Sequence, residues 1–440
     1  MSAIEPAFIE DRPDSSKPAS GAGSQGRNVA RTIGLGLITG AADDDPSAIG
    51  TYASAGAKFG TGFLWAAPVM FPMMVTVVYL SGKLGLVTGQ GLFAVLRRHY
   101  SQRFLTTVLL GVLIGNIIEA GADIGGMAAA LKLFVPIPMG VVVVAVGLIV
   151  LAAQIWGSYT LIRNIFRVLS LALLSYVGAA VLAHPDWGTV LRGTFIPKIQ
   201  FTKDFLAIVV AVIGTSLSAY IYTWQSNEEV EEKIEAGRRR LWQRRGASKA
   251  ELKQSMWDIV FGMVFANAVM YFVILSTAAT LFKAGHHDIN SAADAAQALR
   301  PLAGKGAELL FTLGVIGVGF LAVPVMTTGA AYDLCQSLGW KNGLYRKPGE
   351  AKGFYVATAI FTFMAIGLNF FGINPMKALV WAGIVQGFST PPLMLLILRL
   401  TNNPEIMGKR VNGRAMNVLG WVTTIAIFAA SAGLIVSWFV

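Results

Sequence analysis

The sequence predicts an all-α membrane protein with eleven membrane-spanning segments. Hydrophobic residues make up 55% of the 440 residues and charged residues only 13%, whereas soluble proteins carry about 25% charged residues. Apolar runs of about 20 residues recur along the whole chain, and each is long enough to cross a bilayer. Backbone groups in lipid must be hydrogen-bonded within the protein, and no run alternates as a barrel strand does, so the runs are predicted to be helices.

The apolar runs also set the predicted domain limits. The predicted spans cover residues 30–57, 62–82, 104–131, 137–156, 164–183, 203–226, 256–282, 306–337, 354–371, 376–398 and 415–440. The preceding residues are rich in Ser, Gly, Ala and Pro and lack an apolar core, so a cleavable signal peptide is not predicted. We expect residues 1–29 to form a disordered cytoplasmic tail and residues 30–440 to form one eleven-helix membrane domain.

The distribution of Lys and Arg predicts the orientation, because cytoplasmic loops are enriched in these residues. With the N-terminus inside, most of the 35 basic residues fall on the cytoplasmic side, including a cluster at 238–245. An odd number of spans then places the C-terminus outside, and we expect the plasma (inner) membrane of a prokaryote. The net charge of +11 indicates contact with lipid headgroups rather than nucleic acid, because no soluble domain accompanies the cluster.

Three consecutive aspartates, Asp43, Asp44 and Asp45, interrupt the first span and are followed by Pro46. A carboxylate in the bilayer centre costs about 2.5–3.5 kcal/mol on insertion scales. Proline lacks a backbone N–H and clashes with the preceding turn, so the helix is predicted to break there. Acidic residues at a break in a membrane helix indicate a cation site. We expect Asp45, beside the proline, to be the anchoring ligand, and Asp43 and Asp44 to point in other directions.

The sixth span carries a second interruption, a run of small and polar residues from Gly214 to Ala219. Glycine permits irregular backbone, and Ser and Thr hydroxyls can bond freed carbonyls. Spans 1 and 6 begin two sets of five helices, and matching interruptions in two halves are typical of a transporter binding site. Close helix packing through small residues is the alternative explanation.

Residues 45–60 resemble the first helix of the natural resistance-associated macrophage protein (NRAMP) metal transporters. That helix carries Asp-Pro-Gly-Asn followed by a stretch similar to Gln-Ala-Gly-Ala-Gln-Phe-Gly, and this chain has Asp-Pro-Ser-Ala and Ala-Ser-Ala-Gly-Ala-Lys-Phe-Gly. Residues 84–89, 265–268 and 403–420 resemble further family segments in the same order. The resemblance covers most of the chain after residue 30. It implies a transporter domain with the LeuT-type inverted repeat, spans 1–5 and 6–10, plus an eleventh helix.

The chain departs from the family pattern at the positions that hold metal. Asp45 matches the family's Asp, but Ala48 stands in place of its Asn. The family's sixth helix carries Ala-Thr-Val-Met-Pro-His. The resemblance places Leu217 at the Met, or Ser218 after a one-residue shift, and Ala219 at the His. Neither a thioether nor an imidazole is therefore expected from this helix.

On the third helix, Asp123 falls at a Glu of the family's proton route, and Glu119 lies one turn earlier on the same face. Gln386 lies near a Gln that can join the family's site. The predicted substrate-binding residues are Asp44, Asp45, Ala48, Gly214, Thr215, Leu217, Ser218 and Gln386, with Asp45 as the metal ligand and with Glu119 and Asp123 as a coupling or proton route. A structural hydrogen-bonding role for the latter two remains the alternative.

The missing ligands indicate a hard cation as the substrate. Thioethers favour soft ions, whereas carboxylates, carbonyls and water suit Mg²⁺, Ca²⁺ and Mn²⁺. Mg²⁺ keeps several waters and usually binds one or two carboxylates. NRAMP-related magnesium transporters are described as lacking the Met and are thought to lack proton coupling. The resemblance to that branch implies alternating-access transport of Mg²⁺, with Mn²⁺ also accepted, without proton coupling and without a resident cofactor.

Other functions remain open from the sequence. A small organic cation could pair with Asp45 beside the aromatic faces of Tyr52, Tyr220, Tyr222 or Trp224. A channel or a sensor is a further possibility. An enzyme is not expected, because no Ser-His-Asp set, H-E-x-x-H motif or Walker loop is recognisable. His286-His287-Asp288 is interpreted as ordinary loop, and Cys335 as a packing residue. The sequence carries no signal for an oligomeric state.

Overall fold

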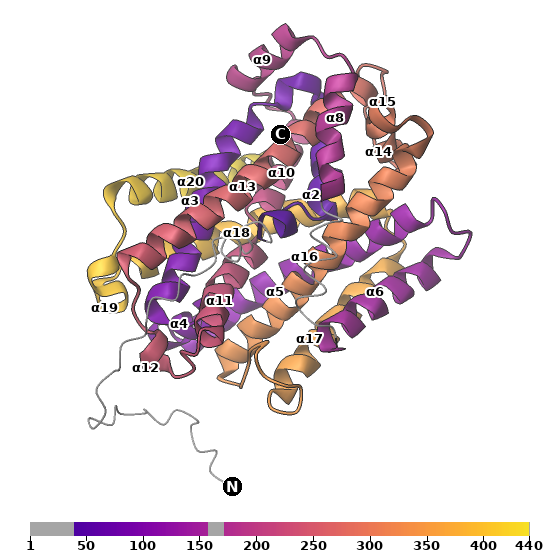
Figure 1. The fold of residues 1–440 in the computed structure, drawn as a ribbon. Helices are drawn as coiled ribbons and strands as arrows, with labels where there is room; N and C mark the ends of the chain where they lie inside the picture. The colour runs from indigo at the N-terminus through magenta and orange to yellow at the C-terminus, as the bar shows by residue number, and fades with distance from the viewer. Residues whose placement is uncertain (1–38, 157–170, 440) are drawn as a thin grey trace, which may run out of the picture.

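The computed structural model describes residues 39–156 and 171–439, which form a bundle of long helices without strands (Figure 1). In this part of the chain, nine helical segments are long and apolar enough to cross a membrane. They are α3 (Ala66–Thr88), α5 (Gln102–Leu131), α6 (Met139–Trp156), α10 with α11 (Lys203–Glu235), α13 with the π-helical turn η3 (Lys249–Phe282), α14 to α16 (Ala292–Leu338), α17 with η6 (Lys352–Phe371), α18 (Pro375–Asn402) and α20 (Arg414–Val436). The predicted all-α membrane architecture is confirmed.

The remaining two predicted spans lie partly outside the described residues. Residues 39–43 are helical and α2 (Pro46–Phe59) continues the first span, whereas 30–38 lie outside. Of the fifth span, η2 (Leu171–Leu174) and α8 (Ser175–Leu182) are described. The prediction of a disordered tail at 1–29 also falls outside. Nine spans are therefore supported, and the other two stay predictions.

Both predicted helix interruptions are present. Asp45 has φ −61° and ψ 171°, which is extended backbone, and it caps α2 by accepting a hydrogen bond from Ala48 N. Pro46 occupies the first turn of α2, where its missing N–H leaves no helix bond unmade. In the sixth span, α10 (Lys203–Ser216) ends at Leu217, and α11 (Ala219–Glu235) begins after Ser218. The sequence pattern at each break thus predicts the observed backbone.

Small residues bring the broken helices close to their neighbours. A Cβ on Gly214 would lie 1.8 Å from the carbonyl oxygen of Gly383 in α18, so the two backbones touch at this point. A Cβ on Gly56 of α2 would lie 2.3 Å from the carbonyl oxygen of Ile274 in α13. Close approach of this kind requires glycine and is typical of helix packing in membranes. The sixth span therefore approaches α18, and the first span approaches α13, at backbone distance.

Short helices mark the two ends of the bundle (Figure 1). One end carries α4 (Leu92–His99) and α12 (Leu241–Arg244), and the opposite end carries α9 (Trp187–Phe195), α14 (Ala292–Ala296) and α15 (Arg300–Ala303). The basic cluster at 238–245, predicted to be cytoplasmic, thus shares one end with α4 and its Arg97. The loop that contains His286 precedes α14, at the other end. The remaining short helix, α19 (Pro404–Met407), precedes α20.

Candidate functional site

The centre of the candidate site is Ser47, in the first turn of α2. Its backbone N–H donates to Asp123 Oδ1 at 2.9 Å. Its hydroxyl lies 2.7 Å from Asp45 Oδ1 and 3.3 Å from Glu119 Oε1. All four side chains are fully buried. One serine therefore joins the carboxylate at the first helix break to both carboxylates of α5, which places the predicted Asp45, Glu119 and Asp123 in a single cluster.

Asp45 is bound from both of the broken spans. Its Oδ1 accepts a hydrogen bond from Ala48 N at 2.7 Å, which fixes the carboxylate at the N-terminus of α2. Its Oδ2 lies 3.0 Å from the hydroxyl of Tyr220 in α11, which also lies 2.7 Å from the carbonyl oxygen of Ala42. Tyr220 therefore spans the break in the first helix. It contacts Asp45 through its hydroxyl.

Glu119 connects the second break to α18. Its Oε1 accepts from the hydroxyl of Ser218 at 3.2 Å, and its Oε2 accepts from Gln386 Nε2 at 2.6 Å. Gln386 Nε2 also lies 3.3 Å from Asn116 Oδ1, one turn before Glu119 on α5. The structure thus brings the predicted residues Ser218 and Gln386 to the carboxylate cluster.

Asp43 and Asp44 differ from Asp45 in their surroundings. Both are fully buried, and none of their carboxylate oxygens has a hydrogen-bond partner among the described residues. The second oxygen of Asp123 is in the same state. An isolated buried carboxylate is very costly unless it carries a proton or is paired with a cation. Asp43 and Asp44 therefore present carboxylate oxygens that no described residue hydrogen-bonds.

The remaining predicted residues of the sixth span pack against neighbouring helices or form hydrogen bonds at the helix end. The Leu217 carbonyl, released by the break, accepts hydrogen bonds from the hydroxyl of Tyr222 and from Thr390 Oγ1, the latter at 3.0 Å. The hydroxyl of Thr215 bonds the Ala211 carbonyl at 3.1 Å, within its own helix. Gly214 touches α18 through its backbone, as described above. For Thr215 and Gly214 the packing alternative fits the geometry, and the Thr215 hydroxyl is hydrogen-bonded within its own helix rather than to the carboxylate cluster.

Two members of the cluster were not predicted from the sequence. Ser47 follows Pro46 directly and stands where the family pattern has Gly. A hydroxyl side chain in place of glycine beside the break could have indicated a contact with the acidic residues. Asn116 lies three residues before Glu119, a spacing that places both on one face of α5. Tyr220 was considered only as an aromatic face, whereas its hydroxyl is the part that contacts Asp45.

The segment His286-His287-Asp288, interpreted from the sequence as ordinary loop, makes loop contacts. His287 Nδ1 lies 3.0 Å from the carbonyl oxygen of Ala57, and its ring packs on Phe282 with centroids 5.1 Å apart. Among the described residues, no group of three or more His, Cys, Asp or Glu side chains converges on one metal position. This includes the carboxylate cluster, whose three bonded members converge on Ser47. Cys335 is buried, as predicted for a packing residue.

Comparison with known proteins assigns the family. The family model described as natural resistance-associated macrophage protein-like matches residues 36–437. A protein named divalent metal cation transporter MntH from Bacillus subtilis (strain 168) is 26% identical over 423 residues, which cover 94% of this chain and 93% of that protein. The protein of the same name from Mycobacterium tuberculosis (strain CDC 1551 / Oshkosh) is 25% identical over 410 residues, with 92% and 90% covered.

Solved structures agree on the fold. A manganese transporter from Eremococcus coleocola, crystallised with an aromatic bis-isothiourea compound, superposes with a TM-score of 0.72 at 19% identity, covering 92% of this chain and 85% of the other. Mhp1 in an inward-facing conformation gives a TM-score of 0.54 at 14% identity, covering 92% and 90%. These similarities confirm the predicted LeuT-type fold. With the family model matching almost the whole chain, the protein is an integral membrane protein that belongs to the NRAMP family.

Proposed function

We propose that this protein is a secondary transporter that moves a divalent cation across the membrane by alternating access, with Mg²⁺ as its main substrate and Mn²⁺ also accepted. One observation carries the proposal: two helix breaks hold Asp45 in a fully buried cluster of carboxylates, beside Asp43 and Asp44, whose oxygens have no partner among the described residues. Relatives over nearly the full length are named divalent metal cation transporters. Asp45 is proposed as the metal ligand, with Asp44 beside it.

The chemistry of the cluster favours a hard cation. The hydrogen-bond partners of Asp45, Glu119 and Asp123 are hydroxyls, amides and backbone N–H groups. Oxygen donors suit Mg²⁺ and Mn²⁺, and thioether sulfur suits softer ions. Met270 Sδ contacts Ser216 Oγ, at the end of α10, at 3.9 Å. Ala48 and Leu217 supply no side-chain ligand, so water would complete the coordination shell that Mg²⁺ retains.

We propose that transport proceeds without proton coupling. Ala219 stands where the family pattern has a His, and it is fully buried at the start of α11. Glu119 and Asp123 are proposed to extend the acidic lining of the cation route from Asp45 along α5. The proposed orientation has the N-terminus in the cytoplasm and the C-terminus outside, in the plasma membrane of a prokaryote, because the Arg-rich loops share one end of the bundle.

Transport in proteoliposomes tests the function. We expect saturable Mg²⁺ uptake by the purified protein, slower Mn²⁺ uptake, and no change in a lumenal pH dye during Mg²⁺ flux. Asp45→Asn removes the charge of the anchoring ligand and should abolish both fluxes. Glu350→Gln is the matched control, since Glu350 is exposed and distant from the cluster, and it should retain uptake. Absence of any divalent flux, or equal flux in Asp45→Asn, would contradict the proposal.

A small organic cation is the alternative substrate. Tyr52, Tyr220 and Tyr222 are all fully buried beside the two breaks, with their hydroxyls bonded to Ser216, to Asp45 and Ala42, and to Leu217, respectively. Tyrosine rings held this way can bind an alkylammonium. Calorimetry with Mg²⁺, Mn²⁺ and a panel of amines separates the two functions. Heat with amines only, lost in Asp45→Asn, would favour the alternative.

A further inference from the structure

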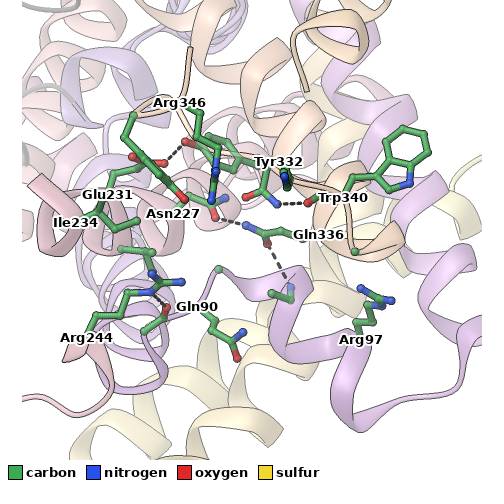
Figure 2. A pocket seen from close by; sticks show the side chains of 18 of the residues that line it. Gln90, Arg97, Asn227, Glu231, Ile234, Arg244, Tyr332, Gln336, Trp340 and Arg346 are labelled. Carbon is green, nitrogen blue, oxygen red and sulfur yellow. Dashed lines mark hydrogen bonds between the residues drawn. The ribbon is translucent and has the colours of Figure 1, made fainter. Parts of the chain in front are cut away.

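A cavity of about 500 Å³ opens at the end of the bundle that carries α4 and α12 (Figure 2). It lies between α4, α11, the end of α16 and the segment 339–346, and it shares no lining residue with the carboxylate cluster. Its volume is within the range of small-molecule sites, which is about 300–1,000 Å³. This end carries the loops that the Arg pattern predicts to be cytoplasmic. The cavity is therefore a second candidate binding site, separate from the proposed transport site.

Positive charge dominates the cavity. Five basic residues line it, namely Arg97, Arg98, Arg244, Lys341 and Arg346, together with one acidic residue, Glu231. The Glu231 carboxylate is engaged with the wall, because its Oε1 accepts from the Tyr332 hydroxyl at 2.5 Å and from Leu344 N at 3.2 Å. Figure 2 shows Arg97, Arg244 and Arg346 on different sides of the cavity. A lining of this composition attracts an anion.

Two of the guanidinium groups are held in place by contacts other than salt bridges. Arg244 Nε donates to the Gly89 carbonyl at 2.7 Å, and its Nη1 donates to the Arg239 carbonyl at 2.8 Å. Arg346 lies over the Tyr345 ring at 4.9 Å, and its buried Nε has no hydrogen-bond partner among the described residues. Burial lowers the pKa of Arg244; Tyr345 and Glu231 raise it, and the nearby Arg346 lowers it further.

The shape of these donors indicates phosphate. Guanidinium groups match phosphate oxygens in a bidentate geometry, and such charge-assisted bonds are stronger than neutral ones. The cavity also exposes the aromatic residues Trp340, Tyr345 and Tyr332. On its floor, Gln336 Nε2 donates to Asn227 Oδ1 at 2.6 Å, and Gln336 Oε1 accepts from Ala94 N at 3.2 Å. Aromatic faces and fixed amides favour a planar base attached to the phosphate.

We propose that this cavity binds a phosphate-bearing anion, with a free nucleotide as the favoured ligand and Arg346 as a contacting residue. A bound anion would link α4, α11 and α16. Because α11 also supplies Tyr220 and follows Ser218 in the carboxylate cluster, this link would hold the second half of the broken span in place and slow the transport cycle. The effect on transport rests on the proposed function, whereas the binding itself does not.

Calorimetry on the full-length protein in detergent tests the binding, with EDTA present so that no divalent cation contributes heat. We expect ATP to bind, and Arg346→Gln to weaken it about tenfold, as the loss of one charge-assisted hydrogen bond predicts. Lys347→Gln is the matched control, since it removes the same charge from the adjacent exposed residue outside the cavity, and it should change affinity less than about twofold. A thermal melt confirms that each variant is folded, and Lys341→Gln is the second cavity variant.

Parallel measurements identify the source of the phosphate. Pyrophosphate tests the phosphate alone, and nanodiscs of phosphatidylglycerol or phosphatidylcholine test a lipid headgroup through the melting temperature. ATP binding that depends on Arg346 supports the nucleotide. Stabilisation by phosphatidylglycerol alone, lost in Arg346→Gln, supports the phosphate site with a lipid source. Binding of none of these, or equal ATP binding by Arg346→Gln and Lys347→Gln, overturns the proposal. Asp45→Asn should still bind ATP, which separates this result from failure of the transport function.

Discussion

The breaks in the first and sixth spans have the same place in the two halves of the molecule but different chemistry. At the first break, Asp45 supplies a charged side chain that caps α2. At the second, the backbone carbonyl of Leu217 is exposed by the break and is then covered by Tyr222 and Thr390. We propose that the first break offers charge to a substrate and that the second supplies a fixed backbone frame. If this is correct, substitutions at the two breaks should affect different measurements.

The largest loss of stability is expected at Gly214, where the end of α10 touches α18. Gly214→Ala places a methyl group 1.8 Å from the Gly383 carbonyl oxygen, so the helices must separate. Overpacking costs about 1–3 kcal/mol, and we expect a cost near the upper end of this range because the new methyl group meets backbone atoms, which cannot move aside as a side chain can. We expect a clear drop in melting temperature in detergent. Gly111→Ala, on α5 with open space around the new methyl group, should leave the melting temperature unchanged or raise it slightly. Equal melting temperatures would show that Gly214 is not a packing contact.

At the first break, Ser47→Ala tests the contribution of the Ser47 hydroxyl independently of that of its backbone N–H. The substitution removes the contacts to Asp45 and Glu119 but keeps the N–H bond to Asp123. Leaving buried carboxylate oxygens with fewer partners costs about 1–3 kcal/mol. We expect a lower melting temperature that Mg²⁺ partly restores, because a cation can replace the lost donor. Ser54→Ala on the same helix removes only a bond to the Gly50 carbonyl and should be nearly neutral. A Ser47 variant as stable as the Ser54 variant would argue against Ser47 as the centre of the cluster.

Leu217→Met tests whether the second break can be given selectivity. The swap conserves volume, so the fold should tolerate it. A thioether at this position should favour Mn²⁺ over Mg²⁺ by about tenfold in competitive uptake, because sulfur prefers the softer ion. The buried Leu398→Met, which packs against Gly420 away from both breaks, should leave the ratio unchanged. An unchanged ratio in Leu217→Met would mean that this side chain does not face the cation.

The smallest loss of stability is expected at the hydroxyl groups that are hydrogen-bonded to the Leu217 carbonyl. Thr390→Val removes one of the two hydroxyls bonded to this oxygen and leaves Tyr222 in place. The loss of one hydrogen bond from a carbonyl that keeps another corresponds to about 1 kcal/mol. Chemical denaturation should report this difference, with uptake rates close to those of the unmodified protein. Thr358→Val, which removes only a bond within α17, is the control. A strong loss of uptake in Thr390→Val would place the carbonyl in direct contact with the substrate.

The helix breaks and the acidic residues could be predicted from the sequence, but their partners could not. Asp-Asp-Asp-Pro and the Gly-Thr-Ser-Leu-Ser run determine backbone behaviour through their own residues, and both breaks are observed where expected. The two roles of Gly214 could not be separated, because packing and ligand binding both call for a small residue. The role of Ser47 was not predicted, because a single serine beside Pro46 carries no charge and does not by itself indicate a binding site. The capping of Leu217 by Thr390 joins residues 173 positions apart and leaves no local signal.

The sequence by itself determined that this protein lies in a membrane, that two of its spans are broken, and that one break carries carboxylates. These properties depend on run length, proline geometry and charge, which act within a few residues. The tertiary structure decided which groups meet. Gln386 reaches Glu119 across 267 positions, Ser47 reaches Asp123 across 76, and the basic cavity gathers α4, α11 and α16. Hydrogen bonds act over about 3 Å, so only the packing of distant helices sets which carboxylate oxygens have partners among the described residues and which do not.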